Sequence, residues 1–142
     1  LDWKQALRVF EQIRTLRPED QGVRKNIIEL NLRMARTDQA LAELENYLTY
    51  LEGQRKGEDA ISFLEELIVE HGDQPALRRA LAALYQQMGR VADAIAQLDA
   101  VGESLLGKGD KDGAMAAINQ ILMMNPPNAD AYRKLLAQVS GR

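Results

Sequence analysis

The chain has 142 residues, of which 46% are hydrophobic and only 5% aromatic, and its formal net charge is −3. This length suits one domain with a real core, and the scarcity of aromatic residues favours packed helices over a sheet. The acidic balance argues against binding to a nucleic-acid backbone, and no apolar run approaches the ~20 residues of a membrane span.

Apolar residues recur at steps of three and four along nearly the whole chain, which is the spacing of amphipathic helices. Segments rich in turn-forming residues interrupt this pattern, and in residues 17–22 and 125–130 a proline follows one helix while a polar residue can cap the next. No segment has the alternation typical of a strand. We therefore expect about eight helices, at residues 2–16, 20–35, 38–52, 57–71, 75–88, 91–106, 110–124 and 129–140.

A repeat is visible in the small residues near the starts of these helices. Their intervals alternate between 34 and 20, which gives a period of 54, and the apolar pattern follows the same period. The sequence therefore predicts a three-helix unit that is present a little more than two and a half times. The small residues are Ala6, Ala40, Ala60, Ala94 and Ala114.

One stretch resembles a known repeat. Its residues have the spacing of the leucine, small residue, tyrosine, turn glycine, small residue and large apolar residue of the tetratricopeptide repeat, a helix–turn–helix unit of about 34 residues. They are Leu81, Ala82, Tyr85, Gly89, Ala94 and Leu98. The chain resembles this family over nearly its whole length, as a variant with a 54-residue unit. Arg24, Arg78 and Tyr132 take the place of the family's early tryptophan.

The resemblance implies an all-α fold, a right-handed α-α superhelix of about eight antiparallel helices. We expect residues 1–142 to form a single domain of this kind. Because the chain begins with LDWKQAL, without a methionine and already in helical rhythm, we also expect it to be part of a longer protein.

Few residues offer reactive chemistry. The chain has one histidine and no cysteine, which argues against a conventional transition-metal site and against nucleophilic catalysis that depends on these residues. The acidic segments at 57–59 and 109–113 lack the full ligand spacing of a calcium loop and are typical of helix N-termini. We expect no enzyme activity, no cofactor and no bound metal.

Three cations recur at the 54-residue interval, namely Lys25, Arg79 and Arg133. In solenoids of the resembled family the helices that open each unit line the concave face, which would place these cations in one row. We expect this row to be joined by Arg24, Arg78 and Lys134. Two interpretations remain open: ion pairs of Lys25 with Glu45 and of Arg79 with Asp99, or a groove that binds a partner's acidic or C-terminal carboxylate segment.

We therefore expect a non-enzymatic scaffold that presents a concave groove to a peptide or helix of a partner protein. The alternative is a structural spacer or self-association module within a multidomain protein, with apolar ends that stack end to end.

Overall fold

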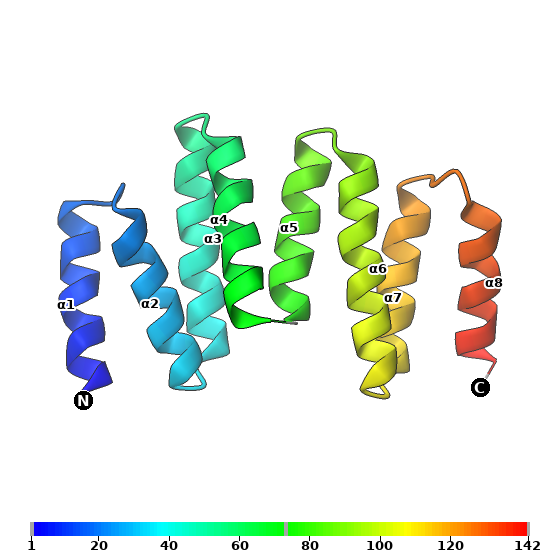
Figure 1. Ribbon diagram of the computed structural model, residues 1–142, viewed down its shortest axis with the longest axis horizontal. Coiled ribbons are helices and arrows are strands. Elements are labelled where there is room, and N and C mark those ends of the chain that lie inside the picture. The colour runs from blue at the N-terminus through cyan, green and yellow to red at the C-terminus, as the bar shows by residue number, and fades with distance from the viewer. Residues whose placement is uncertain (1, 73, 142) are drawn as a thin grey trace. The chain divides into compact units, whose positions relative to one another are not determined.

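A computed structural model describes residues 2–72 and 74–141, and the chain divides into two compact units. Unit 1 comprises residues 1–56 and unit 2 comprises residues 57–142. The described residues form eight helices and no strand, so the expected all-α class is confirmed (Figure 1). Each predicted helix is present, with ends that differ from the prediction by two residues at most.

Unit 1 contains the first three helices, and unit 2 contains the other five. The helices of unit 1 are α1 (Trp3–Leu16), α2 (Gln21–Arg33) and α3 (Thr37–Gly53). Those of unit 2 are α4 (Gly57–His71), α5 (Pro75–Gln87), α6 (Val91–Gly107), α7 (Lys111–Met123) and α8 (Ala129–Ser140). The starts of α1, α4 and α7 are separated by the period of the sequence repeat, as are those of α2, α5 and α8 and those of α3 and α6. Among these described residues, no helix has the length and apolar character needed to cross a membrane.

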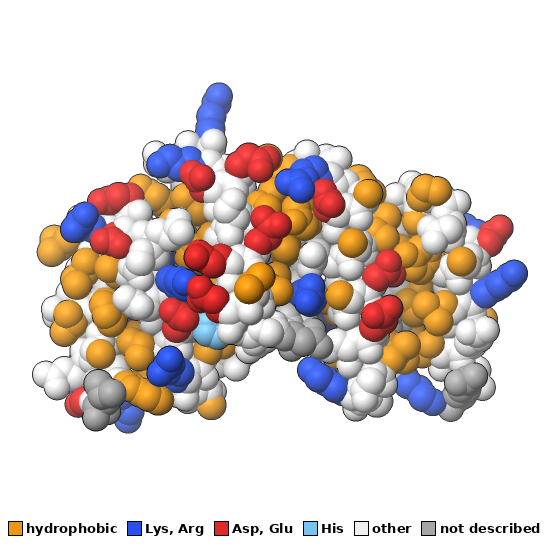
Figure 2. Space-filling view, viewed as in Figure 1, with side chains coloured by type: hydrophobic (Ala, Val, Ile, Leu, Met, Phe, Trp, Pro, Cys, Tyr) orange, Lys and Arg blue, Asp and Glu red, His pale blue; other side chains and the backbone are white. Residues whose placement is uncertain are grey.

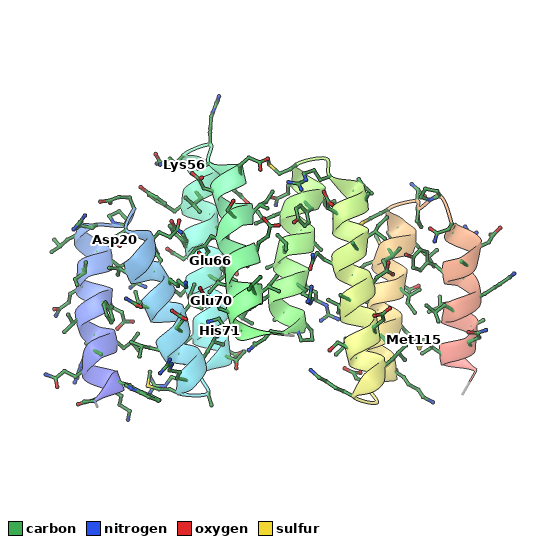
Figure 3. All side chains as sticks on the ribbon, viewed as in Figure 1. Asp20, Lys56, Glu66, Glu70, His71 and Met115 are labelled. Atoms are coloured by element: carbon green, nitrogen blue, oxygen red, sulfur yellow. The ribbon has the colours of Figure 1, made fainter. Side chains whose placement is uncertain are left out.

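Aspartate side chains cap several of these helices. The carboxylate of Asp2 accepts the backbone N–H of Gln5 at 3.1 Å, and that of Asp20 accepts the N–H of Val23 at 3.1 Å. Asp20 lies at the start of α2 in Figure 3. Each cap satisfies a first-turn N–H group that has no partner inside the helix.

The turns after α2, α3, α5 and α6 share one geometry. In each turn a backbone N–H donates to the carbonyl five residues earlier, at 2.7–2.8 Å, and the residue before the donor has a positive φ. This is the Schellman pattern of helix ends. The second pair of turns repeats the first pair one period later. The positive-φ residues are Ala35 and Arg55 in unit 1 and Gly89 and Gly109 in unit 2.

In unit 1, α2 packs against both α1 and α3. Leu7, Val23 and Ile27 form a buried apolar cluster between α1 and α2, and further apolar side chains pack around it. Near the start of α1, the guanidinium carbon of Arg33 lies 5.8 Å from the centre of the Trp3 ring. The middle helix of unit 1, α2, therefore has a packing partner on each of two sides.

In unit 2, α6 packs against both α5 and α7, as its position between two turns predicts. Val101, Leu105, Ala114 and Ala117 form a buried cluster between α6 and α7. The two alanines are fully buried, and small residues at such a crossing let two helix axes approach closely. These two small side chains therefore allow α6 and α7 to pack closely at this crossing.

Candidate functional site

Unit 1 contains a pocket with a cavity volume of about 710 Å³. Its walls come from α1 and from the first half of α3, and side chains of α2 lie between them. Both apolar and charged residues line it. They are Lys4, Leu7, Arg8, Glu11, Arg14, Thr15, Pro18, Arg24, Ile27, Asn31, Arg36, Gln39, Ala42, Glu43 and Asn46.

The pocket contains Asn31, a short side chain at a position where unit 2 has a large one. The buried amide of Asn31 donates to the carbonyl of Ile27, in its own helix, at 2.9 Å. The equivalent residue one period later is Tyr85, whose buried ring reaches α4, where its hydroxyl donates to Glu65 at 3.1 Å. Arg90 stacks on that ring at 4.6 Å. Unit 2 therefore places an aromatic ring where unit 1 has open space.

At the base of the pocket, Glu43 is only 5% exposed and accepts hydrogen bonds from two arginines. Arg14 donates through Nη1 to one carboxylate oxygen, and Arg24 donates through Nη1 to the other at 2.8 Å. Arg24 also donates to the carbonyl of Pro18 at 3.1 Å and to the side-chain oxygen of Asn46 at 2.7 Å. One buried carboxylate thus pairs with two cations, and the cluster keeps one positive charge.

Arg24 is fixed in place by aromatic contacts as well. Its guanidinium carbon lies 5.2 Å from the ring centre of Tyr47 and 5.9 Å from that of Tyr50, and the two rings are stacked. Contacts of this kind between a cation and an aromatic face are attractive. A guanidinium has five N–H donors, and no residue in the described parts of the chain accepts a hydrogen bond from Nη2 of Arg24. This buried arginine therefore lines the pocket and has N–H groups on Nη2 that bond no described residue.

The pocket is positively charged within an acidic chain. Five basic and two acidic side chains line it, which gives a local net charge of +3 against −3 for the whole chain. Lys4 and Arg8 are exposed and Arg36 is half-buried. Within residues 2–72 and 74–141, these three side chains have no ion-pair partner. Their charge is therefore available to a ligand.

Of the six cations expected to form a row, Arg24 lines this pocket. Lys25 and Arg78 are half-buried on α2 and α5, and Arg79 and Lys134 are exposed. Arg133 is exposed and bonds Asp130, one turn earlier on α8, at 2.6 Å.

Two members of the expected row, Arg24 and Arg78, make equivalent polar contacts with a neighbouring helix. Arg24 contacts Glu43, and Arg78 donates to Gln97 at 3.0 Å, so the two pairs have the same sequence separation and occupy equivalent positions of the repeat. Asp99 accepts the hydroxyl of Tyr132 at 2.9–3.0 Å. Burial, together with this bond, raises the pKa of Tyr132 to about 12.

Sequence reasoning missed Arg14 and Glu43, the charged pair at the base of the pocket. A signal was present in the repeat itself, because the equivalent positions of the next unit hold Ile68 and Gln97. A charge at a position that is apolar or neutral in the next unit indicates a local function or a local partner.

Comparison with known proteins found one matching family and a similar solved structure. The tetratricopeptide repeat family matches residues 51–105, a segment that includes the motif from Leu81 to Leu98 and confirms the resemblance there. Among solved structures, the chain is similar to a thermophilic tetratricopeptide repeat protein of Thermus thermophilus. The two are 18% identical, the similarity covers 99% of this chain and 91% of that chain, and the TM-score is 0.34. No curated protein matches the chain.

Proposed function

Residues 51–105 belong to the tetratricopeptide repeat family, whose members are generally scaffolds for protein–protein interaction, and on this premise we propose a non-enzymatic interaction protein. In this proposal the pocket of unit 1 is the groove that receives a segment of the partner. Its size suits a few side chains of a peptide or helix, and its mixed lining suits a segment with apolar and charged residues.

The observation that carries the proposal is the local charge of +3 in a chain of net charge −3. A basic pocket attracts acidic segments and disfavours basic ones, and this effect acts on the association rate as well as on specificity. The partner segment is therefore acidic. Lys4, Arg8 and Arg36 at the pocket wall would bind its carboxylates, and Leu7 and Ile27 would contact its aliphatic side chains.

Two triple variants test this assignment against the expected row of cations. One replaces Lys4, Arg8 and Arg36 with glutamine, and the other replaces Lys25, Arg79 and Arg133 with glutamine. Each removes three positive charges, so the net charge of the chain falls equally in both. The probe is a fluorescein-labelled synthetic peptide of glutamate, leucine and alanine, with binding measured by fluorescence anisotropy.

We expect the pocket variant to bind this peptide at least tenfold more weakly and the row variant to stay within about twofold of the wild type, because the loss depends on proximity. A larger loss in the row variant would overturn the pocket assignment and support the row. Absence of binding to the wild-type chain and to every variant of the pocket would overturn the proposal as a whole.

A second candidate function is self-association, and an apolar hollow in unit 2 favours it. The hollow has a volume of about 170 Å³ and includes Leu106, Leu135 and Val139, and both leucines are 37% exposed. Apolar side chains gather between α7 and α8 on the face shown in Figure 2. Light scattering over a concentration series tests it: a molar mass that rises with concentration would support self-association, and a constant monomer mass would contradict it.

A further inference from the structure

We propose that Glu43 is a built-in competitor for the acidic side chain of the partner and so sets how tightly the unit 1 pocket binds. This inference rests on the proposed function of the pocket. In this role Glu43 determines specificity and is more than a structural counter-ion of two arginines.

The carboxylate of Glu43 lies at the pocket beside two arginines. Glu43 is 5% exposed, lines the pocket and bonds both Arg14 and Arg24. Any partner carboxylate that reaches these two arginines must approach the negative charge of Glu43. Like charges placed side by side across an interface weaken binding strongly, so Glu43 lowers the affinity for the ligand that the pocket attracts.

Of the two arginines, Arg14 is the one that can change partners. Arg24 is held by Pro18, Asn46 and two tyrosine rings, and it is 3% exposed. The side chain of Arg14 is 31% exposed, and Glu43 is its one acceptor among the described residues. Arg14 is therefore the cation that exchanges Glu43 for an incoming carboxylate, while Arg24 stays fixed.

Unit 2 shows what the same position looks like without the competitor. There Gln97 replaces Glu43 and still accepts a hydrogen bond from its arginine, Arg78, at 3.0 Å. Ile68 replaces Arg14. The exchangeable arginine and the competing carboxylate occur together in unit 1, and neither occurs at the corresponding position in unit 2. The Arg78–Gln97 pair also indicates that glutamine at position 43 is compatible with the fold.

The test compares Glu43→Gln with Glu45→Gln in the anisotropy assay with the acidic peptide. Glu45 is exposed on the same helix and does not line the pocket, so its replacement removes an equal charge at another place. We expect Glu43→Gln to bind about tenfold more tightly than the wild type, and Glu45→Gln to stay within about twofold. Circular dichroism shows whether each variant is folded.

A second variant, Glu43→Asp, keeps the negative charge but is one methylene shorter, so it cannot hold both arginines. We expect it to bind about threefold more tightly, because Arg14 is released. If Glu43→Gln and Glu43→Asp bind the peptide no more tightly than the wild type does, Glu43 is not a competitor. If the pocket triple variant still loses affinity in that case, the assignment of the pocket as the binding site is unaffected. Failure of both Glu43 variants to fold would also overturn the competitor role, since Glu43 would then be a structural counter-ion.

Discussion

The pocket of unit 1 and the corresponding part of unit 2 have matching backbones and different interiors. Helix starts and Schellman turns recur with the period of the sequence repeat, and apolar core positions such as Ile27 and Leu81 are equally buried. In contrast, Asn31 gives way to Tyr85 in the next unit, and Glu43 gives way to Gln97. In this chain the positions that shape the helical framework repeat, and the positions that decide whether a cavity is open or filled do not.

The two interiors also differ in how they contribute to stability. Unit 1 keeps a buried ion cluster beside a cavity, which requires hydrogen bonds to compensate for lost hydration. Unit 2 fills the equivalent space with a tyrosine, which buries more apolar surface and needs fewer charges. We therefore expect the polar cavity of unit 1 to contribute less to the free energy of unfolding than the tyrosine at the equivalent place in unit 2.

The largest expected effect comes from deleting the equivalent arginines of the two units. Arg24→Ala removes a buried cation with a charged partner and should lower the free energy of unfolding by about 3–5 kcal/mol. Arg78→Ala removes a half-buried cation that bonds Gln97 and should cost about 1–3 kcal/mol. Urea unfolding of both variants measures the difference. Equal losses would contradict the contrast between the units.

The turns provide a second comparison, with effects of opposite sign. Ala35 has a φ of 58° where Gly89 of unit 2 has 76°, and a left-handed conformation costs a residue with a side chain about 1–2 kcal/mol. We expect Gly89→Ala to lower stability by about 1 kcal/mol and Ala35→Gly to raise it by a similar amount. Thermal melting of the two variants checks the signs. A stabilising Gly89→Ala would show that the two turns are not equivalent.

Tyr132 stands at the position of Arg24 and Arg78 and offers a pH-dependent test. Its pKa is raised to about 12 by burial and by the bond to Asp99, so the folded state favours the protonated phenol. Its contribution to stability is therefore complete below pH ~10, the ordinary pKa of tyrosine, and is lost as the pH rises through about 12. Ultraviolet titration should show late-ionising tyrosines, because burial and the bond to Glu65 also raise the pKa of Tyr85. Tyr132→Phe should remove the component that ionises near pH 12.

Without the hydroxyl, Tyr132→Phe should also lose about 1 kcal/mol of stability near neutral pH, because Asp99 loses its donor. A tyrosine spectrum that titrates fully near the ordinary value would contradict the buried hydrogen bond.

The smallest effect is expected for the exposed pair of Arg133 with Asp130. Solvent screens such a pair, so Arg133→Gln should change stability by less than about 1 kcal/mol. Chemical denaturation of Arg133→Gln and Arg24→Ala compares the loss of unfolding free energy at an exposed arginine with that at a buried one. A loss as large as that of Arg24→Ala would contradict it.

Helix number and helix ends could be predicted from the sequence because they depend on local signals. Apolar periodicity, prolines and capping aspartates such as Asp20 act within a few residues, and the structure places the helices where these signals predict. The turn at Ala35 was less visible, since its left-handed residue is not a glycine.

The candidate site could be predicted only in part, because it depends on side-chain direction. Successive residues of a helix point about 100° apart, so Lys25 and Arg24, which both belong to the expected row, lie on different faces of α2, and of these two only Arg24 lines the pocket. The cavity also depends on whether a side chain at one position bonds its own helix, as Asn31 does, or reaches the preceding helix, as Tyr85 does. Helical periodicity does not predict which of these two partners a side chain will bond.

The stacking of Trp3 with Arg33 has a practical consequence for studying how the molecule unfolds. Trp3 is the single tryptophan of the chain, and both partners belong to unit 1. Indole emission therefore reports on unit 1 alone, whereas far-ultraviolet dichroism reports on the helices of both units. Coincident transitions of the two signals would mean that the units melt cooperatively, and separate midpoints would give each unit its own stability.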